Sequence, residues 1–192
     1  MEHYILTLLI FIPVIGALVM LPVSRFFGNS YSKVVALVAT GIQLTLAAWL
    51  YWNFDSSLSI ESSPFTLNIP WIEHFNIYYY VGVDGLSMPM VLLTALLSFI
   101  CIISSWNIDK RPLGYFSLFL LLDAGMMGVF LSMDFFLFYI FWEVMLLPMY
   151  FLIGMWGGPQ RHYAAIKFFL YTLFGSVFML LSMLALYYYT TP

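Results

Sequence analysis

The chain has 192 residues, of which 64% are hydrophobic and only 8% are charged. A soluble domain carries about 25% charged residues, so this composition excludes an ordinary soluble protein. The net charge of −3 is small and scattered, and it excludes nucleic acid as a partner because nucleic-acid binding needs a basic patch.

Six apolar stretches are long enough to cross a membrane, for which a helix needs roughly 20 residues. No linker separates them, so we predict a single all-α transmembrane domain over residues 1–192 with the lipid bilayer as its surroundings. Ser87 is the expected cap of the third helix. The predicted helices cover about 4–23, 34–52, 86–106, 113–133, 134–155 and 163–189.

The connection at 53–85 is long and carries strand signals. Apolar and polar residues alternate from Phe65 to Ile69, and the stretch from Phe75 to Val83 is rich in aromatic and β-branched residues. Pro70 and the pair Asp84-Gly85 punctuate the connection. This pattern predicts a short β-hairpin on the outer surface of the membrane.

The basic residues predict the orientation of the chain, because cytoplasmic connections carry an excess of Lys and Arg. All six fall at or near the same three connections, and six spans then keep both termini on the outer side. The basic residues are Arg25, Lys33, Lys110, Arg111, Arg161 and Lys167. The acidic residues expected on the opposite side are Glu2, Asp55, Glu61, Glu73, Asp84 and Asp134.

Two acidic residues are predicted near the middle of the membrane. Glu143 is about nine residues into its helix, or roughly 13 Å deep, and Asp123 is at a similar depth. A charged group at a helix centre costs roughly 2.5–3.5 kcal/mol, and such groups usually mark an ion or proton path. The alternative for each is a protonated carboxyl group that bonds to a neighbouring helix and does nothing more. Pro148 follows Glu143 in the same helix and removes a backbone hydrogen bond.

Other polar residues have simpler interpretations. Lys167 is about four residues into the sixth helix, where its long side chain can reach the cytoplasmic interface. Its difference in depth from Glu143, about 10 Å, argues against a direct pair. Asp134 is interpreted as the N-cap of the fifth helix. Arg161 and His162 are interpreted as topology charges and part of a solvated loop.

The sequence carries no pattern for cofactor or metal chemistry. His3, His74 and His162 lie at helix ends or in loops, so no histidine pair at membrane depth is expected to hold a haem. No metal-binding spacing, nucleophile elbow or P-loop occurs. We therefore predict no cofactor and no metal in this chain, which leaves protonation as its chemistry.

Several segments carry a resemblance to a known family. The run FFLFYIFWEVMLLPMYFLIGMW is followed by AAIKFFLYTLFGS, and VGVDGLSMPM and GVFLSMD precede both. In this order they resemble subunit M, also called chain 4 or chain 13, of the proton-pumping NADH:quinone oxidoreductases (complex I). The resemblance extends along the whole chain. Mrp-type cation/proton antiporters and membrane-bound hydrogenases share a looser version of the pattern.

The resemblance implies roles for individual residues. The glutamate of the FWE run, here Glu143, is the proton-path carboxylate of the family, and the lysine of the KFF run, here Lys167, lies at the inner end of the half-channel. An acidic residue is common at the place of Asp123, and the outer hairpin helps to link neighbouring subunits. The implied partners are other membrane subunits of a respiratory complex, and the implied location is the bacterial inner membrane.

The resemblance also shows a departure, because family members are more than twice as long and contain two inverted repeats. The next helix, whose lysine partners the glutamate, is not in this sequence, so we expect a fragment, a split gene product or a truncated reading frame. Three functions stay open. They are a subunit that translocates protons during quinone reduction elsewhere in the enzyme, a subunit of a cation/proton antiporter or hydrogenase, and a structural six-helix stub.

Overall fold

The computed structural model describes residues 4–28, 30–55, 60, 63–72, 74 and 76–190. Within this part, six helices are long and apolar enough to cross a membrane. The prediction of an all-α membrane protein is confirmed. The helices are α1 (Ile5–Phe27), α2 (Tyr31–Asn53), α3 (Ser87–Ser104), α4 (Pro112–Leu131), α5 (Phe135–Trp156) and α6 (Arg161–Thr190), with a 3-10 turn, η4 (Ser105–Asn107), after α3.

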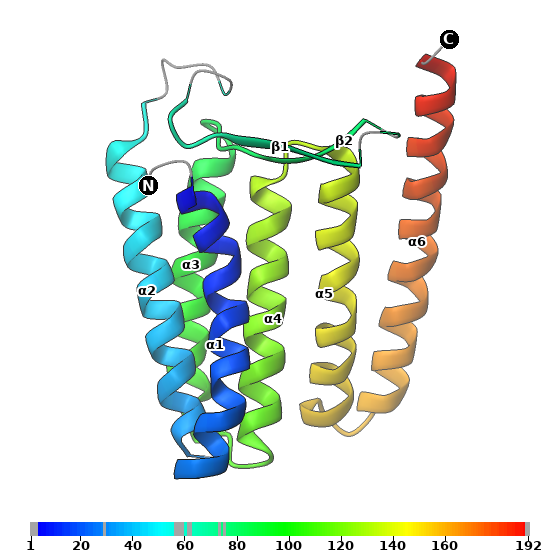
Figure 1. Cartoon of the computed structure of the whole chain (residues 1–192). Helices are drawn as coiled ribbons and strands as arrows, with labels where there is room; N and C mark the ends of the chain where they lie inside the picture. The colour runs from blue at the N-terminus through cyan, green and yellow to red at the C-terminus, as the bar shows by residue number, and fades with distance from the viewer. Residues whose placement is uncertain are drawn as a thin grey trace.

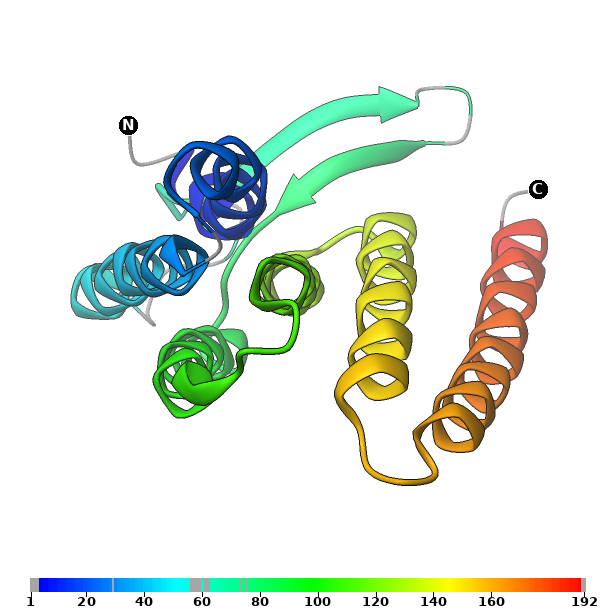
Figure 2. The ribbon, with the colours of Figure 1, turned by 90° about the horizontal axis from the view of Figure 1, so that it is seen from below.

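The six helices run alternately up and down and differ in how they pack (Figure 1). Seen along their axes, α1 to α4 form a cluster, α5 lies beside α4, and α6 lies beyond α5 (Figure 2). Of the apolar stretch of α1, 44% is buried inside the chain, against 6% of that of α6. The core therefore lies within the first four helices, and α5 and α6 extend from it as a single layer.

Local sequence explains where the helices begin. Asp134 caps α5 as expected, since its Oδ1 accepts hydrogen bonds from the backbone N–H groups of Phe136 at 2.8 Å and Leu137 at 3.0 Å. The prediction that Ser87 caps α3 was wrong. Asp84, rather than Ser87, supplies the capping carboxylate, and the Ser87 hydroxyl accepts the Asp84 N–H at 2.9 Å. These reciprocal bonds resemble a capping box.

The predicted hairpin is present as β1 (Leu67–Ile72) and β2 (Ile77–Val81), which pair antiparallel with Leu67 opposite Val81. Pro70, which was expected to punctuate the connection, lies inside β1, opposite Tyr78. Both strands of a two-stranded sheet are edge strands. An edge strand tolerates proline because the hydrogen bond that proline cannot donate is not needed on its outer side. Phe75, counted in the second stretch, lies outside the described residues, as do Glu2, His3, Glu61 and Glu73.

The hairpin is attached to the link between α4 and α5. The Met133 N–H donates to the Tyr80 carbonyl, and the Gly82 N–H donates to the Leu131 carbonyl, both at 2.9 Å. The Asp134 carboxylate that caps α5 also accepts the Tyr78 N–H, through Oδ2 at 3.3 Å. One carboxylate therefore joins β2 to the first turn of α5.

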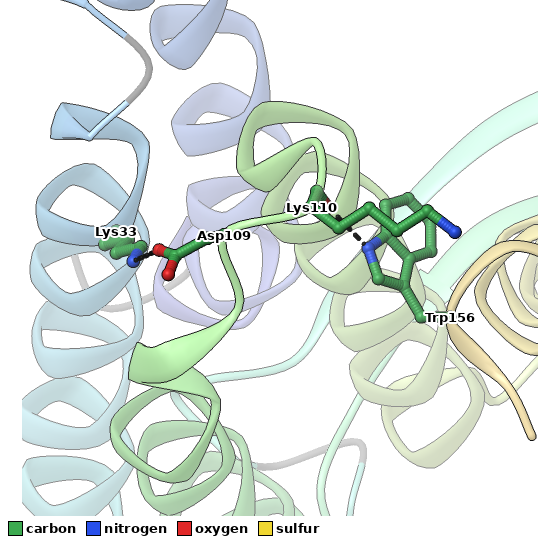
Figure 3. A network of polar contacts seen from close by, with 4 residues as sticks. All are labelled: Lys33, Asp109, Lys110 and Trp156. Carbon is green, nitrogen blue, oxygen red and sulfur yellow. Dashed lines mark hydrogen bonds and ion pairs between the residues drawn. The ribbon is translucent and has the colours of Figure 1, made fainter.

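The opposite end of the bundle holds the basic residues at the α1–α2, α3–α4 and α5–α6 connections (Figure 1). Lys33, which is largely buried, forms an ion pair of 2.9 Å with exposed Asp109, an acid that the charge pattern had not placed on this side. Figure 3 shows that the same loop also contacts α5, because the Trp156 indole N–H donates to the Lys110 carbonyl at 2.7 Å. The loop between α3 and α4 therefore binds both α2 and the end of α5.

Candidate functional site

Glu143 lies on the side of α5 that faces α6. Its carboxyl group lies beside the Tyr139 hydroxyl, one turn earlier in α5, and that hydroxyl also lies beside the Ser176 hydroxyl of α6. Ser176 is 2% exposed and donates to the Leu173 carbonyl of its own helix at 2.9 Å. Tyr139, Glu143 and Ser176 therefore form a polar cluster between two apolar helices, which we call the α5–α6 site.

The other face of α5 explains why Glu143 points to α6. Phe141 and Met145, two residues before and after Glu143, pack against α4, where Gly128 and Gly125 leave room for them. A helix turns by about 100° per residue, so a residue midway between two such neighbours points away from the surface they contact. Packing against α4 thus fixes the direction of the acid.

The carboxyl group of Glu143 has an unsatisfied atom. Its Oε1 is buried and has no hydrogen-bond partner among the described residues. Glu143 is also eight residues beyond the start of α5 at Phe135, a rise of about 12 Å. A buried oxygen without a donor is costly for an ionised carboxylate. The group can gain a partner by binding a proton or a water molecule.

Pro148 adds another polar atom near Glu143. Because proline has no N–H, the Val144 carbonyl, four residues earlier in α5, lacks its helical donor. Val144 directly follows Glu143, so the polar character of this part of α5 does not rest on the acid alone.

Asp123 lies at a separate place in the bundle. Its side chain is fully buried, and the Ser98 hydroxyl of α3 donates to its Oδ1 at 2.6 Å. Asp123 thus bonds to α3, inside the four-helix cluster, whereas Glu143 faces α6. The side chains of Phe141 and Met145 fill the seam between α4 and α5, so the structure does not bring the two acids together.

Lys167 lies on the far side of α6. Its ammonium is 5.6 Å from the centre of the Tyr163 ring and 5.9 Å from that of Tyr171, two residues of the same helix. Ser176 follows Lys167 by nine residues, or about two and a half helical turns, so the two side chains point in opposite directions from α6. Lys167 and Glu143 are therefore on opposite sides of α6, in agreement with the expectation that they form no direct pair.

Sequence reasoning identified the acid of the α5–α6 site but neither of its neighbours. Tyr139 could have been found, since residues four apart in a helix are neighbours on its surface. Ser176 could not, because its proximity depends on how α5 and α6 are aligned. Among the described residues, no group of three or more His, Cys, Asp or Glu side chains is placed to hold a metal ion.

Comparisons with protein families agree with this architecture. Residues 33–134, more than half of the chain, match the family described as NADH-ubiquinone oxidoreductase chain 4, amino terminus. Residues 132–191 match the family described as NADH:quinone oxidoreductase/Mrp antiporter, TM. The second match defines a class, the membrane subunits that NADH:quinone oxidoreductases share with Mrp antiporters. Within this class, the chain belongs to the chain 4, or subunit M, family, which confirms the resemblance seen in the sequence.

Curated relatives show the same family. The chain is 41% identical to NADH-quinone oxidoreductase subunit M of Rhodobacter capsulatus, over 95% of this chain and 36% of that protein. It is 38% identical to NAD(P)H-quinone oxidoreductase chain 4 1 of Synechococcus sp. strain JA-3-3Ab, over 91% of this chain and 34% of that protein. The chain thus spans about a third of the length of these relatives.

Solved structures show the same fold. Respiratory complex I from Thermus thermophilus contains a chain that matches 93% of this chain, with a TM-score of 0.78 and 24% identity, over 35% of its own length. The Mrp complex from Dietzia sp. DQ12-45-1b contains one that matches 90% of this chain, with a TM-score of 0.73 and 19% identity, over 18% of its own length. The fold of this chain therefore occurs in a chain of a respiratory complex I and in a chain of an Mrp complex.

Proposed function

We propose that this chain forms part of a proton-translocating membrane subunit of NADH:quinone oxidoreductase, in which Glu143 binds and releases the transported proton. The observation that carries the proposal is the buried Oε1 of Glu143, which has no partner among the described residues and lies at mid-membrane depth. Ionisable residues at this depth are costly in a membrane, and they usually mark an ion or proton path.

The neighbours of Glu143 give the proton a route into and out of the carboxyl group. A hydroxyl both donates and accepts hydrogen bonds, so Tyr139 and Ser176 can orient a bound proton or a water chain along the α5–α6 interface. Lys167 lies near the basic end of the bundle but on the far side of α6, so it adds positive charge near the inner end of this helix pair without lining the route. Asp123 serves as a second proton-binding carboxyl group.

The energy for translocation comes from electron transfer to quinone in other subunits, and this chain supplies protonation alone. Its partners are other membrane subunits of the complex together with the lipid bilayer. By the positive-inside rule, the end of the bundle with the basic connections faces the cytoplasm, and both ends of this six-helix segment lie on the outer side of the bacterial inner membrane. The location of the basic residues supports this orientation, and the family matches support a membrane subunit of such a complex.

The test is Glu143→Gln in the full-length subunit, assembled in its complex and reconstituted into proteoliposomes. Glutamine keeps the shape of the side chain but cannot carry a proton, so NADH-driven proton uptake is expected to fall to the level of uncoupled vesicles. Asp109→Asn is the matched control, because it removes an acid whose side chain is 89% exposed at the end of the bundle. Undiminished pumping by an assembled Glu143→Gln enzyme would contradict the proposal.

A second function is favoured by the match to the family that includes Mrp antiporters and by the fold shared with the Mrp complex. In this case Glu143 would exchange protons against Na⁺ or K⁺ without electron transfer. The same vesicles distinguish the two functions. Proton movement driven by a Na⁺ or K⁺ gradient in the absence of NADH supports exchange, and proton movement that requires NADH and quinone supports the first proposal.

A further inference from the structure

A buried polar cluster inside α1–α4, distinct from the α5–α6 site, is not explained by packing. Gln43 of α2, Ser98 of α3 and Asp123 of α4 are all at most 2% exposed. The Gln43 side chain lies close enough to Asp123 to interact with its carboxyl group. Each of the three comes from a different helix, and each is at least six residues from the nearest end of that helix. We call these residues the Gln43 cluster.

Pro13 in α1 fixes the orientation of the Gln43 amide. In a regular helix the N–H of residue 13 would donate to the carbonyl of Leu9, but proline has no N–H. The Gln43 Nε2 replaces this donor, with a bond of 3.2 Å to the Leu9 carbonyl. Rotating the amide by half a turn would place two oxygen atoms together and leave the Leu9 carbonyl unpaired. The Gln43 Oε1 must therefore point away from α1.

This orientation leaves two buried oxygen atoms without a donor. Gln43 Oε1 and Asp123 Oδ2 are both buried and unpaired within the described part of the chain. The other Asp123 oxygen, Oδ1, already accepts the Ser98 hydroxyl. Two acceptors cannot satisfy each other, although these side chains are close enough to interact, and each unpaired buried group costs about 1–3 kcal/mol. A single proton on Asp123 Oδ2 would satisfy both.

The charges of the surrounding helices do not favour an ionised Asp123. Besides Asp123, the charged residues of α1 to α4 are Arg25 and Lys33, and α3 has none. Lys33 is ten residues from Gln43 along α2, about 15 Å, and is already paired with Asp109. On α5, which packs on the other side of α4, Glu143 faces α6. An ionised Asp123 would therefore be a buried charge without a counter-ion.

We propose that the Gln43 cluster is a proton-binding site in which Asp123 is a neutral carboxylic acid, its Oδ2–H donates to Gln43 Oε1, and its Oδ1 accepts from Ser98. The proton completes a chain of hydrogen bonds from the Leu9 carbonyl of α1 through α2 and α4 to α3. It joins all four helices of the cluster near the middle of the membrane. The site does not depend on the role proposed for Glu143, because the two acids face different sides of the α4–α5 seam.

The first test is infrared difference spectroscopy on the assembled full-length complex, comparing the wild type with Asp123→Asn. The carbonyl stretch of a protonated carboxylic acid is expected in the wild type at neutral pH, shifted by carbon-isotope labelling of aspartate and lost in the variant. In Gln43→Leu the band is expected to remain but to move to higher frequency, because the acid loses its acceptor. A carboxylate band in place of the acid band would overturn the proposal.

A second test addresses the link to Pro13 through the midpoint of thermal unfolding. Gln43→Leu leaves the Leu9 carbonyl without a donor, so the midpoint is expected to fall. Adding Pro13→Ala supplies the missing N–H within α1, so the double variant is expected to recover part of the loss. Thr40→Val is the matched control, because Thr40 is a buried residue of the same helix whose hydroxyl donates to its own Ala36 carbonyl. Purely additive effects of the two substitutions would overturn the assigned amide orientation.

These measurements separate the two proposals. The infrared band and the midpoint report on Asp123 whether or not the complex pumps protons. An acid band together with normal pumping by Glu143→Gln supports the Gln43 cluster and contradicts the proposed function. A carboxylate band together with loss of pumping by Glu143→Gln contradicts the Gln43 cluster and supports the proposed role of Glu143.

Discussion

The first four helices and the last two are apolar to a similar degree but bury their surfaces very differently. Of the apolar stretch of α4, 39% is buried inside the chain, whereas the corresponding fraction for α6 is 6%, although α6 is the more hydropathic of the two. Apolar composition therefore identifies a membrane span without indicating whether lipid or protein covers it. The polar groups differ in the same way, since Asp123 is enclosed by four helices and Glu143 lies at an interface of two.

The largest effect is expected from a matched pair of phenylalanines. Phe116 in α4 is fully buried, and Phe174 in α6 is 66% exposed. Phe116→Ala is expected to lower the free energy of unfolding in detergent by about 3–5 kcal/mol, because it leaves a cavity. Phe174→Ala is expected to change it by less than about 0.5 kcal/mol. Equal losses would remove the distinction between the two regions.

The seam between the regions gives the next effect. A Cβ atom added at Gly128 would overlap the Phe141 ring, so Gly128→Ala is expected to destabilise the packing of α4 on α5 by about 1–3 kcal/mol. Gly175→Ala is the control, since a Cβ atom there meets nothing within 4 Å. Alanine is a better helix former than glycine, so this control is expected to stabilise α6 by about 0.5–1 kcal/mol. Unfolding in detergent measures both, and a loss in the control would show that α6 is covered.

A smaller effect is expected at the outer end of α5. Asp134→Ala removes the cap of this helix and the bond to Tyr78, at an expected cost of about 0.5–2 kcal/mol. Hydrogen exchange is expected to speed up at the Phe136, Leu137 and Tyr78 amides. Asp134→Asn keeps an acceptor oxygen and is expected to protect the same amides. Unchanged exchange in the alanine variant would contradict the link between β2 and α5.

The smallest effect is a pH dependence at the start of α3. The backbone N–H of Ser87 is the main cause that lowers the pKa of Asp84 below its ordinary value of 3.8. Because the pKa is lower in the folded state, Asp84 stabilises the fold fully above that value, and the contribution is lost as the pH falls through the lower, folded pKa. Thermal midpoints measured against pH should show this acid loss in the wild type and lack it in Asp84→Asn.

The fold could largely be predicted from the sequence, but the surroundings of the acids could not. Stretches of about 20 apolar residues predict the spans, and the FWE and KFF segments predict the family, because both signals are contiguous in sequence. The Asp134 cap is equally local. By contrast, Ser176 reaches the α5–α6 site only through the alignment of two helices. Gln43 becomes significant only once α2 is placed beside Pro13 of α1.

Local rules also failed where a neighbouring segment intervened. Pro70 was expected to punctuate the outer connection, but it lies inside β1, because both strands of a two-stranded sheet are edge strands. Asp109 is one acid next to two basic residues, so the charge pattern did not predict its ion pair with Lys33. This pair joins the α3–α4 loop to α2. Both cases depend on contacts between segments that are distant in sequence.

The Phe141 and Met145 side chains that fill the α4–α5 seam have an electrical consequence. They place hydrocarbon between two carboxyl groups of similar depth. Hydrocarbon offers no hydrogen-bond partners along which a proton could move. The seam acts as an insulating layer. If Glu143 binds the transported proton as proposed, this layer directs the proton along the α5–α6 interface and keeps it out of the interior of the first four helices.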